Sequence, residues 1–523
     1  MTEQNFETLL QRPFVSMPEL LRWHADRQPE APAVMQDEQC LNYRELDALM
    51  DRVAASLQRD GVPPQGAIAI CAANSIRYAA LYMGAVRAGV TVAPLAPSTT
   101  AEGLVGMVDD SEARILFVDA AVAGALEPVR DRLTVPFVTL DDSPAGRSFS
   151  DWLADEGATP EPVDIQPEWP LNIIYSSGTT GVPKGIEQPQ SQRWGHVKRG
   201  IERQYGPGSL ALLSTPLYSN TTLLPFFQSL GLGGAVRLMA KFDAERFLQL
   251  AEQHRATHTT LVPVQYRRIM ALPNFDQFDL SSFRVKFCTS SPFPADLKRD
   301  VLARWPGELI DTYGMTEGGG VCQLEAHRFP DKLHTVGRPV PGHDIRVIDD
   351  EGKELPRGET GEVVGHSGAM MLGYRNQPEM TAEAEWYDPS GKRFMRTGDV
   401  GYFDDDGFLV IVDRKKDMII SGGFNIYPSD IELVLRDHPH VAEATVVGVP
   451  SERWGETPVG FVVPRADAPA DAEAIRDWAN ERLGKTQRLA AVSFTDRLPR
   501  SAIGKVLKRD LRDAWLARGG DAS

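Results

Sequence analysis

Residues 67–94 read AIAICAANSIRYAALYMGAVRAGVTVAP and contain a strand-helix-strand pattern. Two short apolar runs, residues 67–71 and 90–94, flank a segment at 76–88 whose apolar residues have helical spacing. A helix between two buried apolar runs is typical of the crossover that joins parallel strands. This stretch therefore predicts an α/β fold with largely parallel sheets.

The same alternation continues on both sides of this stretch. Upstream, two helical segments enclose a short apolar run, and downstream another strand is followed by a connector rich in proline and acidic residues. A further strand follows the connector. The expected elements are helices at 17–25 and 43–57, strands at 33–35, 115–118 and 171–175, and the connector at 158–170.

Later parts of the sequence predict smaller units. Short β-runs separated by Gly, Asp and Pro turns over residues 361–412 predict a small antiparallel β subdomain. A charged segment follows, and after it a stretch long enough for a separate domain. We predict a large N-terminal domain over residues 1–413, built from layered parallel-rich sheets flanked by helices, then a hinge at 414–417 and a small mobile α+β domain over 418–523. The small domain is expected to hold helices at 428–437 and 472–483 and strands at 444–449 and 458–463.

Composition narrows the class of protein. The 523 residues carry a formal net charge of −17, which argues against a nucleic-acid partner because such binding needs a basic surface. The four cysteines have no CxxC spacing, so neither a zinc site nor a disulfide framework is expected. The start MTEQNFETLL lacks signal-peptide features, and no apolar stretch approaches the ~18 residues of a membrane span. We expect a cytoplasmic protein and leave open whether it forms a homodimer.

A loop rich in glycine and hydroxyl residues follows the expected strand at 171–175. Residues 175–185 read YSSGTTGVPKG. Glycines let backbone N–H groups approach phosphate oxygens, while hydroxyls add donors and the lysine adds positive charge. The spacing is not that of a Walker A motif. A plain flexible Ser/Gly loop is the alternative, but such a loop rarely ends in Pro-Lys-Gly, and we favour a phosphate-binding loop.

Four further motifs follow this loop along the chain. They are YGMTE at 313–317, RTGD at 396–399 with Arg414 after it, SGGFNIYPSDIE at 421–432 and SAIGK at 501–505. The five motifs in this order resemble the acyl-adenylate-forming (AMP-binding) enzyme superfamily, in particular its acyl- and aryl-CoA synthetase branch. There they form the phosphate loop, the adenine and magnesium motif, the ribose-binding stretch, the loop after the hinge and the C-terminal lysine motif.

The resemblance implies a site for ATP and Mg²⁺. Adenylation brings together two anions, a carboxylate and the α-phosphate, so positive charge must lie where negative charge develops. The implied catalytic residues are Lys505, Glu317, Thr316 and Lys184, with Glu317 as the Mg²⁺ ligand. The implied ATP- and AMP-binding residues are Ser176, Ser177, Gly178, Thr179, Thr180, Gly181, Thr312, Tyr313, Gly314, Met315, Asp399 and Arg414. Taken alone, Glu317 would be a surface acid and Asp399 a turn residue; the order of the motifs favours the catalytic roles.

The C-terminal lysine motif implies movement. Taken alone, Lys505 before the basic residues 508–512 would be a solvated end of a helix. By resemblance, it enters the active site for adenylation and leaves when the small domain rotates for transfer. The resemblance places the pivot of that rotation at Lys416, and closure about a short hinge is an established switching mode.

The acid-binding pocket is expected to be uncharged. The resemblance assigns it Tyr218, Ser219, Asn220, Ser290, Ser291, Gly318, Gly319 and Val321. Many related ligases have histidine where Ser219 stands, so the pocket departs from that pattern. No carboxylate occurs between Ser214 and Phe227 to pair with the ammonium of an α-amino acid. We expect an uncharged aryl, cyclic or medium-chain acid.

The acceptor is expected to be coenzyme A. The resemblance assigns its tunnel to Ser421, Gly422, Gly423, Phe424, Trp454 and Arg488. Trp454 has an equally good alternative as a buried anchor of the small domain. Residues 483–489, LGKTQRL, lack the aromatic–Lys–x–Pro stretch common in CoA ligases, which leaves room for an amine acceptor.

The sequence thus predicts an acid–CoA ligase that uses ATP, Mg²⁺ and coenzyme A and releases AMP and pyrophosphate. The first alternative is a ligase that passes the acyl group to an amine. A carrier-dependent adenylation module is disfavoured because only about twenty residues follow Lys505, too few for a carrier domain. A non-catalytic nucleotide-binding protein would leave Lys184, Glu317 and Lys505 unused. Luciferase-type oxidation is left open by the motifs.

Overall fold

The computed structural model describes residues 6–176, 184–421, 424–451, 454–466, 471–485, 487–501 and 504–519. Contacts divide the chain into two compact units. The first unit comprises residues 1–334, 339–344 and 365–395, and the second comprises residues 335–338, 345–364 and 396–523. The predicted hinge at 414–417 rests on an expected motion and stays a prediction. Its residues 415–417 form a single turn of 3-10 helix (Lys415–Asp417).

Two large sheets dominate the chain, and most of their strand pairs are parallel. The nine-stranded sheet has the order β16-β15-β14-β13-β12-β10-β11-β1-β2, and the eight-stranded sheet has the order β19-β9-β8-β4-β3-β5-β6-β7. In the nine-stranded sheet, β1 pairs with β11, β10 with β11 and β12, and β13 with β12 and β14, all in parallel. In the eight-stranded sheet, β3 pairs in parallel with β4 and β5, and β4 with β8. The predicted fold class is confirmed.

The strands of the nine-stranded sheet are β1 (Pro32–Gln36), β2 (Gln39–Asn42), β10 (Leu210–Leu213), β11 (Ala235–Leu238), β12 (His258–Leu261), β13 (Val285–Cys288), β14 (Glu308–Gly314), β15 (Val321–Glu325) and β16 (Arg338–Pro339). Those of the eight-stranded sheet are β3 (Ala67–Cys71), β4 (Thr91–Pro94), β5 (Ala113–Val118), β6 (Phe137–Thr139), β7 (Arg147–Ser148), β8 (Pro170–Ser176), β9 (Lys184–Pro189) and β19 (Gly373–Tyr374).

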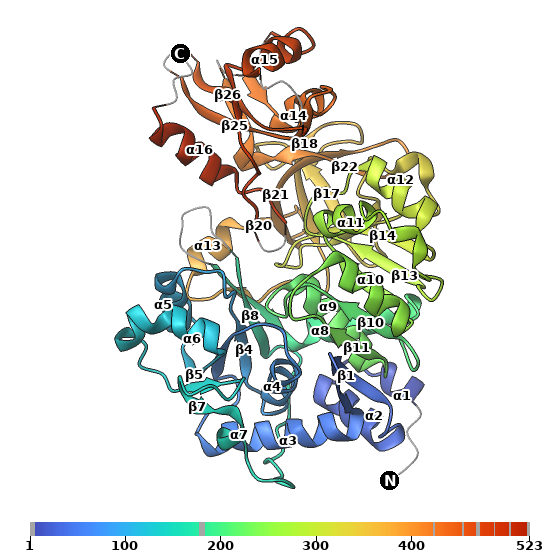
Figure 1. Ribbon diagram of the computed structural model, residues 1–523, viewed down its shortest axis with the longest axis vertical. Coiled ribbons are helices and arrows are strands. Elements are labelled where there is room, and N and C mark those ends of the chain that lie inside the picture. Colours follow the sequence, from blue (N-terminus) through green and yellow to red (C-terminus); the bar gives the residue numbers. More distant parts are fainter. Residues whose placement is uncertain are drawn as a thin grey trace. The chain divides into compact units, whose positions relative to one another are not determined.

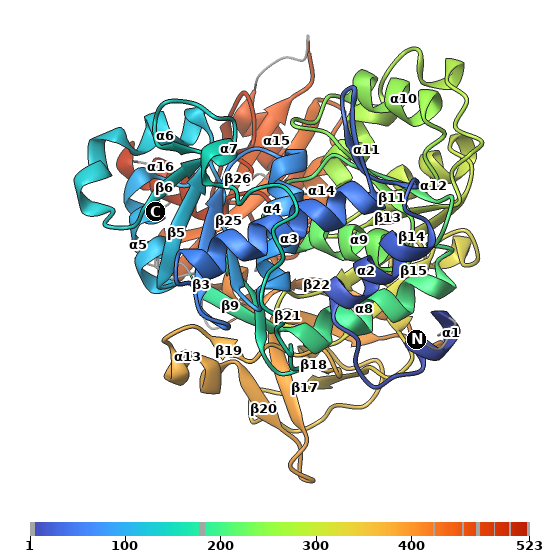
Figure 2. The ribbon, with the colours of Figure 1, turned by 90° about the horizontal axis from the view of Figure 1, so that it is seen from below.

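A layer of helices separates the two large sheets. In Figure 2, helices α3 (Tyr43–Arg59), α4 (Ile76–Arg87), α8 (Gln190–Glu202) and α9 (Asn220–Gly231) cross the middle of the view, with β3 and β5 on one side and β11, β13 and β14 on the other. Helix α4 contacts β4 of one sheet and β1 of the other, which explains why every residue along it except Arg77 is buried. Helix α3 packs closely on α4, since a Cβ on Gly84 would lie 2.5 Å from Val53.

Local signals account for where the helices begin. Helix α3 begins at a capping box in which Asn42 and Glu45 exchange side-chain and backbone hydrogen bonds. Its buried residues include Leu46, Met50 and Val53, at the i, i+4, i+7 spacing of one helix face. The other helices of the first unit are α1 (Phe6–Leu10), α2 (Met17–Arg27), α5 (Ala101–Asp110), α6 (Ala120–Leu126), α7 (Phe149–Trp152), α10 (Ala244–Gln253), α11 (Pro263–Met270), α12 (Ala295–Arg304) and α13 (Pro378–Glu383), with 3-10 turns at Glu127–Arg132, Phe275–Gln277 and Pro330–Lys332.

Two five-stranded sheets complete the fold. One has the order β17-β18-β21-β20 with β22 beside β21, and the other the order β24-β23-β26-β25 with β27 beside β26. In the first, β21 pairs antiparallel with β20 and with β22, as predicted for the small β subdomain. That sheet already begins at Asp344 rather than at residue 361. Its strands are β17 (Asp344–Ile348), β18 (Gly361–His366), β20 (Glu385–Tyr387), β21 (Arg393–Phe403) and β22 (Leu409–Arg414).

The C-terminal sheet and its helices appear in orange and red in Figure 1. The strands are β23 (Ile419–Ser421), β24 (Phe424–Ile426), β25 (Val441–Ser451), β26 (Gly455–Pro464) and β27 (Ala491–Phe494), and the helices are α14 (Pro428–Arg436), α15 (Ala472–Asn480) and α16 (Lys508–Ala517). Helix α15 ends before the predicted residue 483 because the Asn480 amide donates to Leu489 O and accepts from Leu489 N–H, which turns the chain toward β27. Within the described ranges, no helix is long and apolar enough to cross a membrane.

A largely buried ion pair anchors the last helix of the second unit. Lys508 Nζ lies 3.0 Å from Glu432 Oε1, and their side chains are 21% and 12% exposed. Burial would raise the pKa of Glu432, but Lys508 and the hydrogen bonds from Val446 N–H and Thr445 hold it below the ordinary 4.5. The stabilisation is therefore present at pH 7 and is lost only as the pH falls through that lowered pKa.

Replacing Lys508 by methionine removes the buried cation beside the Glu432 carboxylate and leaves it the half-exposed Arg436, whose Nη2 lies 3.3 Å from Glu432 Oε2. We expect the free energy of unfolding to fall by about 3 kcal/mol at pH 7, measured by urea denaturation. Arg509→Met is the control, because Arg509 and its partner Asp513 are 65% and 63% exposed and such surface pairs contribute about 0–1 kcal/mol. Equal losses in the two variants would contradict the anchoring role.

Candidate active site

The predicted phosphate loop connects two paired strands of the first unit. Strands β8 and β9 are antiparallel neighbours, and their register places Ser176 opposite Lys184 and Tyr175 opposite Gly185. The predicted residues Ser177, Gly178, Thr179, Thr180 and Gly181 lie outside the described residues. The two ends of the loop, Ser176 and Lys184, are thus held together as a strand pair.

The turn that carries Thr316 and Glu317 follows the end of strand β14. Thr312, Tyr313 and Gly314 lie in that strand, and Gly314 pairs with Val321 of β15 on the other side of the turn. The backbone carbonyl of Thr316 accepts a hydrogen bond of 2.7 Å from Nε2 of Gln188, a residue of β9. A strand of the eight-stranded sheet therefore holds a turn that belongs to the nine-stranded sheet.

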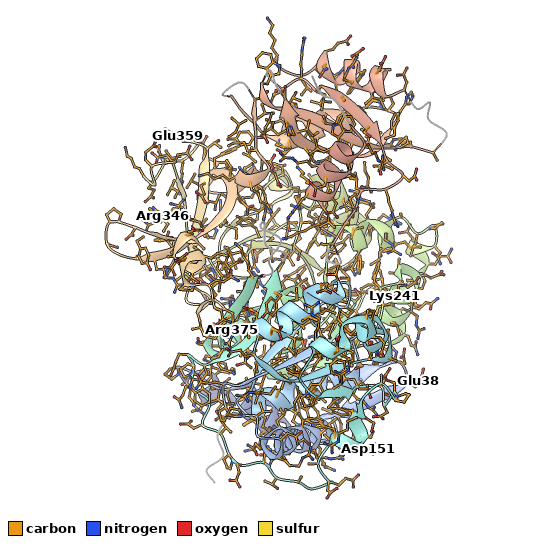
Figure 3. The ribbon with its side chains drawn as sticks, turned by 90° about the vertical axis from the view of Figure 1, so that its left-hand side faces the viewer. Glu38, Asp151, Lys241, Arg346, Glu359 and Arg375 are labelled. Atoms are coloured by element: carbon orange, nitrogen blue, oxygen red, sulfur yellow. The ribbon has the colours of Figure 1, made fainter. Side chains whose placement is uncertain are left out.

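Residues 371–375 connect the same two elements a second time. Met371 N–H donates to Glu317 O over 2.8 Å, and Arg375 N–H donates to Gly185 O over 2.7 Å. Between them, β19 pairs antiparallel with β9. Arg375, labelled in Figure 3, also forms ion pairs with Glu187 and Glu112. This segment keeps the Glu317 turn in register with the strand that begins at Lys184.

Tyr374 contacts the Glu317 side chain directly. Its hydroxyl donates to Glu317 Oε1 over 2.9 Å, and its ring centroid lies 5.0 Å from Lys184 Nζ. Burial, together with the negative charge of Glu317, raises the pKa of Tyr374, so the phenol stays protonated and donates. The sequence reasoning missed this residue, because Tyr374 lies 57 positions from Glu317 and no local motif connects them.

The Glu317 carboxylate fits Mg²⁺ chemically. Mg²⁺ takes hard oxygen ligands, usually one or two carboxylates with phosphates and water completing the shell. Within the described ranges, no group of three or more His, Cys, Asp or Glu side chains could hold a metal by itself. A single carboxylate beside the Thr316 hydroxyl suits a metal that arrives with its phosphates, and Tyr374 occupies only Oε1.

In the second unit the two residues predicted to bind ribose contact each other. Arg414 Nε lies 2.9 Å from Asp399 Oδ1, and the two residues are register partners in strands β21 and β22. Asp399 is 7% exposed and follows Gly398, whose φ of +68° bends the strand. Asp399 is thus a strand residue held by an arginine, rather than the turn residue that its Thr-Gly-Asp context would suggest.

Lys505 lies in a tight turn of the same unit. Ser501 N–H donates to Lys505 O, Lys505 N–H donates to Ser501 Oγ, and Gly504 has a φ of +81°. The Lys505 side chain is exposed, and helix α16 with its Lys508–Glu432 pair begins three residues later. Lys416 is also exposed, on the single 3-10 turn after β22.

The predicted acid-pocket residues form two groups in the first unit. Ser219 caps helix α9, and the Thr221 hydroxyl lies 2.7 Å from the Ser290 hydroxyl. Asn220 begins the helix, and its buried Oδ1 has no hydrogen-bond partner among the residues that the structure describes. Ser290 has a φ of +81°, a backbone strain typical of functional sites. The contact between Thr221 and Ser290 brings the two segments together. The first group therefore consists of Tyr218, Ser219, Asn220, Ser290 and Ser291. Gly318, Gly319 and Val321 form the second group, in the turn that follows Glu317.

Among the predicted acceptor residues, the structure brings two together. Ser421 of β23 pairs with Gly455, the neighbour of Trp454. Trp454 is 46% exposed, which excludes its alternative role as a buried anchor. Arg488 lies on the segment that precedes β27. Gly422 and Gly423, and the side chain of Phe424, lie outside what the structure describes.

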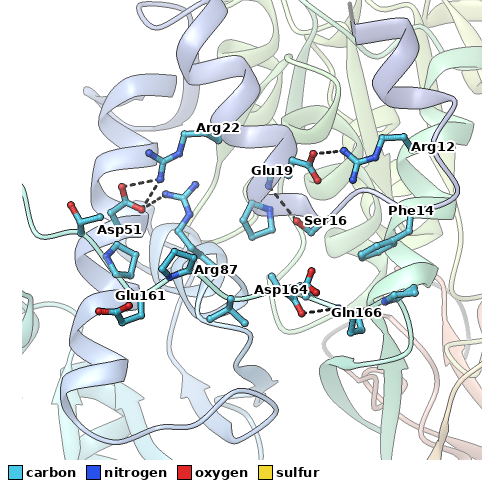
Figure 4. A pocket seen from close by; sticks show the side chains of 17 residues that line it. Arg12, Phe14, Ser16, Glu19, Arg22, Asp51, Arg87, Glu161, Asp164 and Gln166 are labelled. Atoms are coloured by element: carbon cyan, nitrogen blue, oxygen red, sulfur yellow. Dashed lines mark hydrogen bonds and ion pairs between the residues drawn. The ribbon is translucent and has the colours of Figure 1, made fainter. Parts of the chain in front are cut away.

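A cleft of about 590 Å³ lies elsewhere in the first unit, between helices α2, α3 and α4 and residues 159–167. Figure 4 shows that its arginines are paired: Arg22 and Arg87 both contact Asp51, and Arg12 contacts Glu19. None of the residues predicted for ATP, acid or acceptor lines it. Satisfied ion pairs explain these charges without a ligand.

Comparison with known protein families tests the resemblance directly. The AMP-binding enzyme model matches residues 21–375, and the AMP-binding enzyme C-terminal domain model matches residues 430–505. The chain belongs to the AMP-binding enzyme family. Its relatives place it in the acyl-adenylate-forming superfamily, in the acyl- and aryl-CoA synthetase branch.

Two relatives and one solved structure illustrate the range of this AMP-binding enzyme's neighbours. A fatty acid–[acyl-carrier-protein] ligase, ScoC, from Streptomyces coeruleorubidus is 32% identical, over 94% of this chain and 95% of the relative. An indoleacetate–CoA ligase from Aromatoleum aromaticum is 34% identical, over 94% and 98%. The structure of the amide bond synthetase McbA from Marinactinospora thermotolerans matches with a TM-score of 0.84 and 28% identity, over 95% and 99%.

Two glycines of this AMP-binding enzyme make a matched pair for testing the site geometry. A Cβ on Gly318, whose φ is +79°, would lie 2.0 Å from Ala369 O, whereas a Cβ on Gly195 in helix α8 would meet nothing within 4 Å. We expect Gly318→Ala to destabilise the fold by at least about 2 kcal/mol. Gly195→Ala should stabilise it by up to about 1 kcal/mol, because alanine favours a helix. Thermal unfolding monitored by circular dichroism measures both, and equal melting temperatures would contradict the described turn.

Proposed function

We propose that the protein is an acid–CoA ligase. It joins an uncharged aryl, cyclic or medium-chain carboxylic acid to AMP, releases pyrophosphate, and transfers the acyl group to coenzyme A. The observation that carries this proposal is the position of Glu317. Its carboxylate is hydrogen-bonded by Tyr374, whose ring contacts Lys184 at the base of the predicted phosphate loop. A carboxylate and a lysine held by one tyrosine suit a site for Mg·ATP.

In the first half-reaction, an oxygen of the acid attacks the α-phosphate, a new O–P bond forms, and the bond to the β-phosphate breaks. Lys184 would neutralise charge on the phosphate chain, and Lys505 would lie between the carboxylate and the α-phosphate. Glu317 would hold Mg²⁺, which when bound neutralises phosphate oxygens. Asp399 would accept hydrogen bonds from the ribose hydroxyls, and its ion pair with Arg414 keeps the carboxylate oriented.

In the second half-reaction, the coenzyme A sulfur attacks the acyl carbon, a C–S bond forms, and AMP leaves with the C–O electron pair. Ser421 and Trp454 would border the path of the acceptor. We propose that Lys505 withdraws for this step by rotation of the small domain about Lys416. The printed names of relatives support coenzyme A as acceptor, since indoleacetate–CoA ligase is 34% identical.

Two similar proteins have names that point to acceptors other than coenzyme A. McbA is named an amide bond synthetase, and ScoC is named an acyl-carrier-protein ligase. The missing aromatic–Lys–x–Pro stretch before β27 favours testing the amine alternative in particular. The acceptor is therefore one variable of the first experiment.

Incubation of the purified protein with ATP, Mg²⁺ and a panel of acids tests the proposal. We expect AMP and pyrophosphate in equal amounts, and acyl-CoA when coenzyme A is added, each identified by mass spectrometry. Parallel reactions replace coenzyme A with amines or with a phosphopantetheinylated carrier protein. ADP and phosphate as products would overturn adenylation, and an amide or acyl carrier would overturn only the acceptor.

Tyr374→Phe removes one hydrogen bond to the Glu317 carboxylate and keeps the ring over Lys184. Such a bond to a charged group contributes about 1.5–3 kcal/mol. We expect the Mg²⁺ concentration for half-maximal adenylation to rise about tenfold, with activity recovered at saturating Mg²⁺. Mn²⁺ binding in the presence of ATP, followed by electron paramagnetic resonance, should weaken in parallel. Glu317→Gln should lower the rate itself by ~10²–10³.

Tyr205→Phe is the matched control for this substitution, since the Tyr205 hydroxyl is buried without a hydrogen-bond partner among the described residues. Its Mg²⁺ dependence should equal that of the wild type. An unchanged Mg²⁺ dependence in Tyr374→Phe would show that the Tyr374 contact does not position Glu317 for the metal.

Lys505→Ala should separate the half-reactions. We expect formation of acyl-adenylate from acid and ATP to fall by ~10² or more, because an ammonium between two anions is lost. Transfer from chemically supplied acyl-adenylate should stay near normal. Lys416→Pro should do the reverse, since proline fixes φ at the proposed hinge. Normal adenylation by Lys505→Ala would rule out the two-step domain movement.

A further inference from the structure

The C-terminal end of helix α5 is unfavourable by the rules of helix electrostatics. Two carboxylates, Asp109 and Asp110, occupy its last turn, and that turn has no basic residue. The C-terminus of a helix carries partial negative charge and unpaired carbonyl groups, so acidic side chains there cost stability. Asp109 is exposed, whereas Asp110 is only partly exposed. Proteins break such local rules mainly at functional sites, so the contacts of Asp110 need an explanation.

The Asp110 carboxylate holds Tyr175, the residue before the predicted phosphate-binding residues. The Tyr175 hydroxyl donates to Asp110 Oδ2 over 2.7 Å, while the Met107 carbonyl oxygen lies farther away, at 3.2 Å. A phenol has one proton to donate, and the charged carboxylate is the stronger acceptor. Burial, followed by the hydrogen bond to Asp110, raises the pKa of Tyr175, so the phenol stays protonated and donates.

Arg375 and Asn376 bind the same helix end. Arg375 Nε and Asn376 Nδ2 lie 3.4 Å and 3.1 Å from the Asp110 carbonyl oxygen, and Asn376 Nδ2 lies 3.3 Å from Asp110 Oδ1. These donors cap a carbonyl that the helix leaves unpaired. Asn376 has a φ of +53°, a strained conformation that persists where surrounding contacts hold it. Strand β8 and helices α5 and α13 therefore meet in one part of the first unit (Figure 1).

These contacts reach both ends of the predicted phosphate loop. Tyr175 and Gly185 are register partners in β8 and β9, each one residue outside an end of the loop. Arg375 N–H donates to Gly185 O over 2.7 Å. A Cβ on Gly185 would lie 3.1 Å from Tyr175 Cε1 and 3.2 Å from Arg375 Cβ, so the Tyr175 ring packs directly against this strand pair. Asp110 therefore contacts the residue where the loop begins and, through Arg375, is connected to the residue where it ends.

We propose that Asp110 is a positioning residue that holds the phosphate loop in place for the phosphates of ATP. It lies 65 positions before Tyr175 and belongs to none of the five motifs. Asp110 acts through the Tyr175 hydroxyl rather than on the nucleotide. Because donors that are already ordered lose less freedom on binding, a fixed loop binds the phosphate chain more tightly. The inference rests on the proposed function, which supplies ATP as the ligand of the loop.

Calorimetric binding of ATP and of AMP tests this role before the acid is identified. AMP has one phosphate where ATP has three, so the position of the loop should matter more for ATP. Tyr175→Phe keeps the ring and removes the hydroxyl, and Asp110→Ala removes the acceptor. In both variants we expect the Kd for ATP to rise about tenfold and the Kd for AMP to change by less than about twofold. Equal weakening of both nucleotides would indicate a general structural role and overturn the inference, as would an unchanged Kd for ATP.

Three further variants assign the effect to this hydrogen bond. Asp109→Ala is the matched control, because it removes the exposed carboxylate from the same helix end, and it should leave both Kd values unchanged. Asp110→Asn should recover most of the affinity for ATP, since the amide oxygen can accept from the Tyr175 hydroxyl. The double variant Tyr175→Phe/Asp110→Ala should bind ATP about as well as either single variant. Additive losses, or an equal loss in Asp109→Ala, would refute the assignment.

Failure of the proposed function would give a different result. A wild-type protein that binds ATP but releases no pyrophosphate with any acid would contradict the ligase, while the ATP affinities of the variants would still decide the role of Asp110. A wild-type protein that binds neither nucleotide would overturn both.

Discussion

The position of Glu317 depends on hydrogen bonds from residues 371–375. Met371 holds its backbone, Tyr374 holds its carboxylate, and β19 between them is part of the eight-stranded sheet. Glu317 itself follows a strand of the nine-stranded sheet. The connection is made by backbone pairing and by the Tyr374 hydroxyl, so the Glu317 carboxylate is hydrogen-bonded beside the strand that begins at Lys184. Preorganisation of this kind means that little reorganisation is needed when charge develops during reaction.

A buried polar network supports this junction from the interior. Arg193 of α8 is completely buried, and its guanidinium donates to the side-chain oxygens of Asn172 and Gln188. Gln188 in turn donates to the Thr316 carbonyl. Each group in this series depends on the next, since an unsatisfied buried donor is expensive. Helix α8 and the turn that carries Glu317 are therefore fixed by the same set of hydrogen bonds.

Sequence predicted the elements well wherever local patterns encode them. Apolar runs such as residues 67–71 became buried parallel strands, and the spacing over 76–88 became α4. The motifs assigned Asp399 and Arg414 to one predicted ribose site, and in the structure the two side chains contact each other. Contacts between residues distant in the sequence could not be predicted, because no periodicity connects Tyr374 with Glu317. The same holds for Arg199 and His343, which are 144 positions apart. The burial of polar residues of α8 such as Arg193 was equally unpredictable, since it depends on how the helices pack. Trp454 shows the reverse case: an aromatic residue suggested a core position, and the fold left it exposed.

The length of residues 371–375 matters as much as their identity. Met371 N–H and Arg375 N–H donate to Glu317 O and Gly185 O, and β19 pairs with β9 between them. Because successive side chains on a strand point to opposite faces, one inserted or deleted residue would turn Tyr374 away from Glu317. Descendants of this protein would therefore tolerate substitutions in this segment more readily than changes in its length.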